Sequence, residues 1–151
     1  MAISGVTENR AISIDNRVSN KIIIDTNVAI YLAKGDRSPW AAAFKPMIEG
    51  KIVAVAFATA AELLLTSRKS PTPKRTLSYW HERLKLLAIL TPDIQTCEIW
   101  AEITADLKNS GFTRQDNDLW IAACAIRHGL PLVTNNKKDF THIHRLELIT
   151  P

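Results

Sequence analysis

The sequence predicts one α/β domain in which a parallel sheet of about five strands lies between two layers of helices. Short apolar runs rich in β-branched residues recur along the chain, and helical patterns separate them. The first of these runs ends abruptly in a carboxylate. With 151 residues the chain suits a single domain with a sizeable core.

The composition is that of an ordinary globular protein, with 46% hydrophobic and 23% charged residues. No apolar run has the length needed to span a bilayer, and the N-terminus lacks the order of a secretory signal, so we expect no membrane association. Cys97 and Cys124 form no metal-binding or redox spacing. We expect both to be small buried residues in a reducing cytoplasm.

Net charge is +4 at pH 7, which gives a surface that tolerates or attracts polyanions. A net charge of this size is weak evidence for a nucleic-acid partner when taken alone. It becomes stronger evidence if the cations surround an acidic centre that binds metal.

The N-terminal part divides into a leader and a first strand. Residues 1–20 are polar and lack periodicity, so we interpret them as a flexible leader and place the domain at residues 21–151. Ile22–Ile24 is typical of a strand buried on both faces. It runs into Asp25, which either caps the next helix, over Val28–Lys34, or points into a functional crevice beyond the strand.

The next elements leave a second acid with two interpretations. A Ser-Pro pair begins a helix over Trp40–Ile48, and Ile52–Phe57 is a second strand. Thr59 then stands three residues before Glu62, which is the spacing of a capping box. Glu62 therefore either bonds back to the start of its own helix or faces the functional edge of the sheet.

The rest of the chain continues the alternation of helices and strands. A basic segment with two prolines is expected to be a solvated loop. The alanines of a late helix allow close packing against the sheet. The expected elements are a loop over 67–75, a helix over Leu77–Lys85, a strand over Leu86–Leu90, a helix over Thr96–Lys108, a helix from Asn117 or Asp118 to Gly129, and strands over Leu132–Thr134 and Leu146–Ile149.

Four acids follow the end of a strand or occupy the first turn of a helix: Asp25, Glu62, Asp118 and Asp139. A doubly wound sheet brings such positions to one edge, where the carboxylates would repel one another and burial would raise their pKa values. A divalent cation removes that conflict, and oxygen ligands favour Mg²⁺ or Mn²⁺ over zinc. A carboxylate-bound metal beside a basic surface indicates phosphodiester hydrolysis.

Four segments, IIIDTNVAI, TAAELL, NDLWIAACAIRHGLPLVTNNKKDF and LELI, resemble the PIN-domain ribonucleases of the VapC toxin type. The resemblance extends from Lys21 to the C-terminus. It implies a three-layer α/β/α PIN-like domain and a Mg²⁺-dependent endoribonuclease, with Mn²⁺ as a substitute, that cleaves tRNA or other structured RNA. It also implies a homodimer and a VapB-like antitoxin that holds the toxin inactive.

Carried over by position, the resemblance makes Asp25, Glu62 and Asp118 the metal ligands and catalytic acids. Asp139 matches a position that is often acidic, and it is a further catalytic candidate. One of the carboxylates, for which we favour Glu62, would take the proton from water.

Polar residues around these acids are expected to support them: Asn27, Thr134 and Asn136. Many members carry a fourth acid where this chain has Asn136, which predicts tight binding of one metal and weak binding of a second. Asp116 fits the pattern less well than its neighbour two residues on. Candidate partner contacts are Tyr31, Leu32 and Trp40, and candidate phosphate-binding residues at the rim are Arg68, Lys69, Lys74, Arg75, Arg114, Lys137 and Lys138.

Three other classes compete with this interpretation. Phosphatases of the haloacid dehalogenase type need an acid two residues after the first Asp, where Asn27 cannot transfer a proton. A phosphoacceptor receiver domain needs a late lysine, and Lys137 is poorly placed for that role. A non-catalytic PIN-like module that binds RNA or protein stays open as the alternative, although the three intact acids favour an enzyme.

Overall fold

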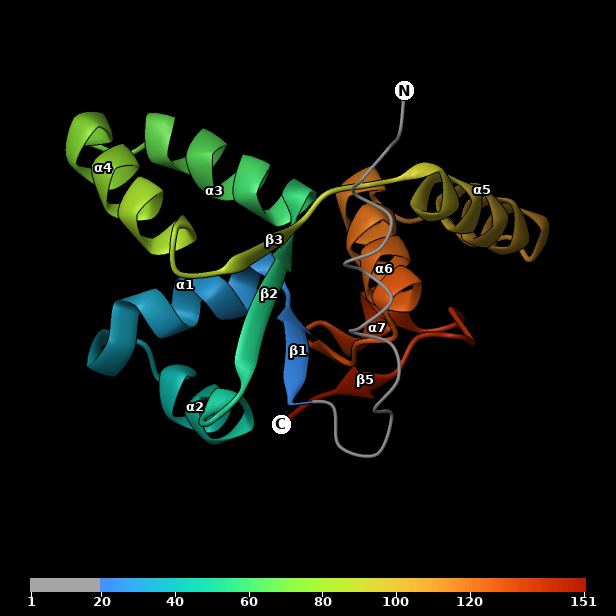
Figure 1. Cartoon of the computed structure of the whole chain (residues 1–151), viewed down its shortest axis with the longest axis horizontal. Helices are drawn as coiled ribbons and strands as arrows, with labels where there is room; N and C mark the ends of the chain where they lie inside the picture. The colour runs from blue at the N-terminus through green and yellow to red at the C-terminus, as the bar shows by residue number, and fades with distance from the viewer. Residues whose placement is uncertain (1–19) are drawn as a thin grey trace, which may run out of the picture.

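A computed structural model describes residues 20–151, so the predicted leader lies outside the described residues apart from Asn20. Within this part of the chain, five strands form one parallel sheet in the order β3-β2-β1-β4-β5 (Figure 1). The predicted α/β fold is confirmed. The strands are β1 (Lys21–Ile24), β2 (Ile52–Ala56), β3 (Ala88–Leu90), β4 (Leu132–Val133) and β5 (Leu148–Ile149).

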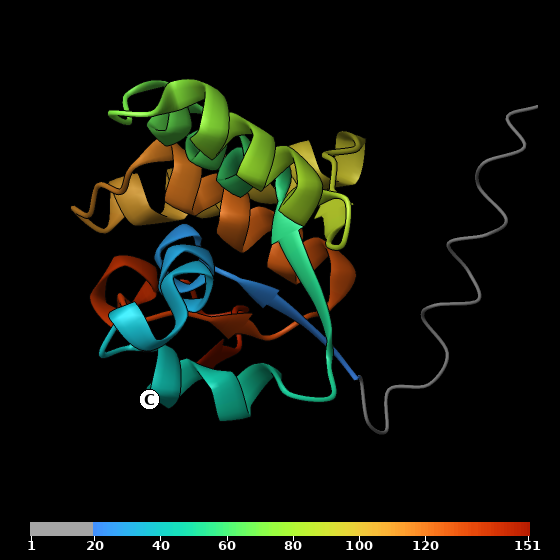
Figure 2. The same cartoon turned by 90° about the vertical axis from the view of Figure 1, so that its left-hand side faces the viewer.

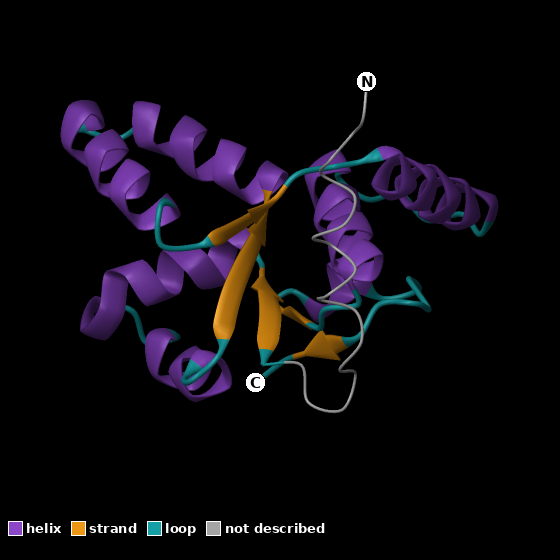
Figure 3. Cartoon of the chain, in the orientation of Figure 1, coloured by secondary structure: helices purple, strands orange, loops and turns teal. Residues whose placement is uncertain are grey.

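Helices cover both faces of the sheet, which gives three layers (Figures 2 and 3). One face carries α1 (Thr26–Lys34), α2 (Ala41–Ile48), α3 (Phe57–Arg68) and α4 (Pro73–Leu84), with a 3-10 turn at Gly35–Arg37. The other face carries α5 (Ile94–Asn109), α6 (Asp116–His128) and α7 (Lys137–Phe140). No helix in residues 20–151 is long and apolar enough to cross a membrane.

The side chains of β1 alternate between two cores, because successive residues of a strand point to opposite faces. Ile22 and Ile24 pack with Val28 and Phe44 on the face covered by α1 and α2. Ile23 belongs to the opposite core, with the alanine-rich face of α6. This two-sided burial explains the continuous β-branched run in the sequence.

The strand order reverses at the junction between β1 and β4. From β1 the chain moves outward to β2 and β3, whereas β4 and β5 lie on the other side of β1. In open parallel sheets, ligands bind beyond the carboxyl ends of the strands at such a reversal. Asp25 follows β1 and Thr134 follows β4, so both lie at the expected binding position.

Several helix boundaries differ from the prediction. Helix α1 begins at Thr26, two residues early, because Asp25 acts as its N-cap. Helix α4 begins at Pro73, since proline is well suited to a first turn, and α3 continues to Arg68. Both helices shorten the expected basic loop. Helix α2 begins at Ala41, with Ser38 accepting a hydrogen bond from the Trp40 amide.

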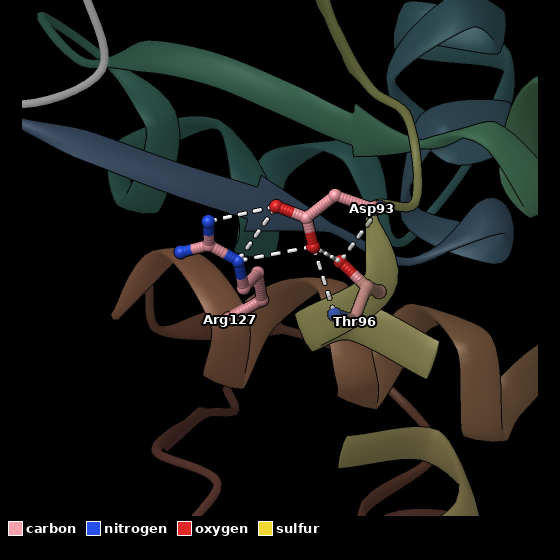
Figure 4. A network of polar contacts seen from close by, with 3 residues as sticks. All are labelled: Asp93, Thr96 and Arg127. Atoms are coloured by element: carbon pink, nitrogen blue, oxygen red, sulfur yellow. Dashed lines mark hydrogen bonds and ion pairs between the residues drawn. The ribbon is translucent and has the colours of Figure 1, made fainter. Parts of the chain in front are cut away.

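The start of α5 is tied to the end of α6 by a polar network (Figure 4). Asp93 caps α5 by accepting from the Thr96 amide at 2.8 Å, and the Thr96 hydroxyl accepts from the Asp93 amide at 3.2 Å. Arg127, in the last turn of α6, donates to the same carboxylate at 2.7–3.1 Å. The predicted start at Thr96 was therefore wrong by two residues, because Asp93 supplies the cap.

The two cysteines differ in burial. Cys124 is buried among the alanines of α6, as predicted, and burial raises the pKa of its thiol to about 12. Cys97 is exposed on α5, so the expectation of a buried residue was wrong there. The buried face of α5 carries Ile103 and Leu107, and Cys97 lies outside it.

Candidate metal centre

A cleft of about 450 Å³ lies at the carboxyl edge of the sheet, where the strand order reverses. All four predicted acids line it. The cleft residues are Asp25, Thr26, Asn27, Glu62, Thr113, Arg114, Gln115, Asp118, Asn136 and Asp139. The fold therefore brings together side chains from α1, α3, α6 and α7 that are far apart in the sequence.

Asp25 is a buried residue of the cleft and is held by two donors. Its Oδ1 accepts from the Thr26 amide at 2.7 Å, and its Oδ2 accepts from the Thr134 hydroxyl at 2.8 Å. The Thr134 oxygen in turn accepts from the Asn136 amide at 2.9 Å. Asp25 thus caps α1 and also lines the cleft, so the two interpretations of this residue are compatible.

Burial raises the pKa of Asp25 above its ordinary value, since a carboxylate with only 5% of its surface exposed loses solvation. The hydrogen bonds from Thr134 and Thr26 oppose that rise, and the charge of Asp139 adds to it.

Glu62 turns toward the cleft and not toward the start of its helix. Helix α3 begins at Phe57, so Thr59 lies inside it, fully buried, and the capping-box interpretation is wrong. Glu62 Oε1 accepts from the Thr26 hydroxyl at 3.1 Å, and that hydroxyl also lies 3.1 Å from the Thr59 oxygen. Burial raises the pKa of Glu62, and the charge of Asp25 raises it further.

Asp118 lies in the cleft with its pKa well above the ordinary value for an aspartate. It lies in the first turn of α6, which begins at Asp116, slightly before the predicted start. Burial raises the pKa of Asp118 to about 6, with further contributions from Asp25, Asp139 and Glu62. The positive charge of Arg114 only partly offsets that rise. The acids in this cleft therefore repel one another.

The remaining predicted residues fall into two groups. Asn27, Asn136 and Asp139 line the cleft, whereas Thr134 does not line it but donates a hydrogen bond to Asp25. Asp116 is exposed and is not among the cleft-lining residues, in agreement with its weaker match to the pattern.

Sequence reasoning missed two functions of polar side chains. Thr26 bridges the first two acids, because its amide contacts Asp25 and its hydroxyl contacts Glu62. Asn117 makes a side-chain hydrogen bond to Glu62 that lowers the pKa of that acid. Both residues directly neighbour a predicted acid in the sequence, which was the available signal.

The donor chemistry of the cleft fits a hard divalent cation, because its negatively charged side chains are carboxylates and its further oxygen donors are hydroxyl and amide groups. Burial raises the pKa values of Asp25, Glu62 and Asp118, and the charges of neighbouring carboxylates add to that rise, so a nearby cation would favour their ionised forms. The arrangement is open: among residues 20–151, no three acidic, histidine or cysteine side chains are already clustered as a metal-ligand set.

The fold and the acidic cleft together are those of a PIN domain, and the PIN domain family matches residues 22–146. The chain belongs to this family. Ribonuclease VapC1 of Rickettsia felis is 33% identical over 85% of this chain and 95% of its own length. Ribonuclease VapC2 of Haemophilus influenzae is 32% identical over 82% of this chain and 92% of its own length. Within the PIN domains, the chain is a member of the VapC ribonucleases.

Two further comparisons extend this result. The tRNA(fMet)-specific endonuclease VapC of Shigella flexneri is 28% identical over 82% of this chain and 92% of its own length. Among solved structures, VapBC2 from Rickettsia felis bound to a promoter DNA fragment matches with a TM-score of 0.75 and 25% identity, covering 87% and 98% of the two chains. VapBC-1 from nontypeable Haemophilus influenzae matches with a TM-score of 0.74 and 27% identity, and the match covers 86% of this chain and 97% of that one.

Proposed function

We propose that this protein is a Mg²⁺-dependent endoribonuclease toxin that hydrolyses phosphodiester bonds in RNA. The observation that carries the proposal is the convergence of Asp25, Glu62, Asp118 and Asp139 on one cleft at the strand-order reversal. Membership of the VapC ribonucleases supports the activity.

Asp25, Glu62 and Asp118 would hold the metal, with Mn²⁺ able to replace Mg²⁺, and Asp139 and Asn136 would assist. When bound, such a metal acidifies a water molecule and stabilises negative charge on the phosphate. The protein holds Asp25 rigidly through the Thr26 amide and the Thr134 hydroxyl. Glu62 is oriented by Thr26 and is the group we expect to take the proton from water.

The proposed substrate is tRNA or another structured RNA in the cytoplasm. The name of the Shigella flexneri relative supports tRNA, and the net charge of +4 suits a polyanion. Six of the seven cations predicted at the rim are exposed and can reach phosphates without reading bases: Arg68, Lys69, Lys74, Arg75, Lys137 and Lys138.

The proposed assembly is a homodimer neutralised by a VapB-like antitoxin, in keeping with the VapBC complexes that the fold resembles. Of the three predicted contacts, Trp40 is 45% exposed and available to a partner. Tyr31 and Leu32 are half-buried, and Tyr31 stacks on Phe44 at 6.0 Å. Light scattering of the protein alone and with the antitoxin would test the assembly, and a monomer indifferent to antitoxin would contradict it.

Cleavage of total cellular RNA by the purified, antitoxin-free protein tests the activity. Wild type, Asp25→Asn and Asp116→Asn are compared with Mg²⁺ and with a chelator. We expect discrete products from wild type and Asp116→Asn, and none from Asp25→Asn or with the chelator. Asp116→Asn is the matched control, because it removes a carboxylate outside the cleft.

Cleavage that survives both Asp25→Asn and the chelator would overturn the metal mechanism. If folded wild type cleaves nothing, Mg²⁺ calorimetry separates an unsampled substrate from a non-catalytic binding module. A module without metal binding at the acidic cleft would favour the alternative.

A further inference from the structure

Arg114 contacts four backbone carbonyls on two segments that carry cleft acids. It lies just before α6, and its Nε donates to Asp139 O at 2.8 Å. Its Nη2 donates to Lys138 O at 3.2 Å and to Thr141 O at 3.5 Å. Its Nη1 donates to Thr113 O at 2.8 Å. The guanidinium thus joins the entrance of α6 to the end of α7.

Helix α7 contains only four residues, Lys137–Phe140, so contacts with the rest of the protein hold it in place. A single helical turn is not stable by itself, and its last carbonyls have no partners within the helix. A cation at this end satisfies those carbonyls by donating hydrogen bonds to them. The same turn carries Asp139 and begins after Asn136, and both residues line the cleft.

A second contact holds the same two segments together. The rings of Phe112 and His142 stack with centroids 4.0 Å apart and 17° between their planes. His142 has a φ of 75°, a left-handed conformation that is uncommon for residues other than glycine. The Arg114 guanidinium lies 5.6 Å from the Phe112 ring centre. Phe112, Arg114 and His142 therefore form one clamp around the end of α7.

The hydrogen bonds of Arg114 also limit what else it can do. A guanidinium has about five N–H donors, and four carbonyls occupy most of them here. Two parallel N–H groups are needed to bind a phosphate as a fork. Arg114 therefore differs from the exposed rim cations among which the sequence placed it.

We propose that Arg114 is a positioning residue that holds α7, and with it Asp139 and Asn136, against the first turn of α6. The front of α7 is already tied to Asp25, because the Asn136 amide donates to Thr134 and Thr134 donates to Asp25. Arg114 holds the other end of α7, through the carbonyls of Lys138, Asp139 and Thr141. The inference rests on the proposed nuclease function for its catalytic consequence, but not for its structural one.

Arg114→Lys tests the inference, because lysine keeps the charge but cannot reach several carbonyls as a planar fork. Arg145→Lys is the matched control, since Arg145 is an exposed residue in a single ion pair with Glu102. The first readout is amide hydrogen exchange of Asn136 and Asp139 in the metal-free, full-length protein. We expect about tenfold faster exchange at both amides in Arg114→Lys and no change in Arg145→Lys.

The second readout is steady-state RNA cleavage at saturating Mg²⁺. A displaced acid should lower kcat by about 10–100-fold and leave KM nearly unchanged. Phe112→Leu, which removes the ring stack and keeps the guanidinium, should raise exchange at the same amides to a smaller extent. Circular dichroism checks that each variant is folded.

Unchanged exchange at Asn136 and Asp139 in Arg114→Lys would overturn the proposal. So would a raised KM with an intact kcat, which would make Arg114 a phosphate contact. If wild-type protein cleaves no RNA, the proposed function fails, whereas the exchange measurement still decides whether Arg114 holds α7.

Discussion

The hydroxyl of Thr134 donates a hydrogen bond to Asp25 Oδ2 at 2.8 Å, although the two residues are 109 positions apart in the chain. They meet because β4 lies directly beside β1 in the sheet, and each residue follows its strand. This bond partly offsets the burial that raises the pKa of Asp25. The strand-order reversal thus supplies both the acid and a donor that favours its ionised form.

Replacing Thr134 by valine should leave Asp25 Oδ2 without its side-chain donor. A hydrogen bond to a charged group contributes about 1.5–3 kcal/mol, so we expect RNA cleavage to fall by about 10–100-fold. The pKa of Asp25 should rise further, because the opposing contribution is lost. Single-turnover cleavage measures the effect, and Thr134→Ser, which keeps the hydroxyl, should restore most of it. Equal rates for the valine and serine variants would contradict this role.

Asp118→Asn should abolish cleavage and yet stabilise the metal-free protein. Its pKa of about 6 lies above the ordinary value of 3.8, so the folded state binds protons more tightly than the unfolded state. The free energy of unfolding of the wild type should therefore rise as pH falls from about 6 to about 4. Because Asp118 is half-exposed, we expect a gain of only about 1–2 kcal/mol from the asparagine at pH 7.

Denaturant unfolding in the presence of a chelator, from pH 4 to pH 7.5, checks this expectation. Asp116→Asn is the control on the same helix, outside the cleft. A loss of stability in Asp118→Asn at pH 7 would show that the buried Asp118 charge, beside the other acids, does not destabilise the folded state. Added Mg²⁺ should stabilise wild type more than the asparagine variant, since a ligand that binds the folded state stabilises it.

The sequence sufficed for those parts of the site that depend on a local pattern. Asp25 was predictable because a buried strand ends at it, and the sheet type follows from the alternation of strands and helices. Asp118 was predictable as an acid in the first turn of an alanine-rich helix. These features are set by neighbouring residues, so they can be read without tertiary structure.

Other features depend on contacts between distant segments. The spacing of Thr59 and Glu62 fits a capping box, yet α3 begins two residues before Thr59 and Glu62 bonds to Thr26. The position of Arg114 on the end of α7 has no local signal, because a four-residue helix lies below the length that periodicity detects.

Asp93→Ala should destabilise the protein by about 1–2 kcal/mol at pH 7, mainly through loss of the N-cap of α5. The ion pair with Arg127 is bidentate but partly exposed, which limits its contribution. Arg127 and the Thr96 donors lower the pKa of Asp93, so the stability that its charge contributes is present above about pH 4 and is lost as pH falls further.

Denaturant unfolding at pH 7 and pH 2.5 should show a smaller difference in the free energy of unfolding between Asp93→Ala and wild type at the lower pH. A gap that is constant with pH would contradict the role of the charge, and Glu82→Ala, in an exposed pair with Lys85, is the control.

Asn136→Asp should strengthen Mg²⁺ binding, because it adds a carboxylate to a cleft already lined by four. The bond from the Asn136 amide to Thr134 uses the backbone and is kept. We expect about tenfold tighter binding, or about 1.4 kcal/mol, and a less stable metal-free protein because the added charge repels the others. Calorimetry with Mg²⁺ and unfolding with a chelator measure the two effects, and Asn135→Asp, one residue away and not among the cleft-lining residues, is the control. Equal Mg²⁺ affinity in the Asn136→Asp variant and wild type would show that this position does not contact the metal.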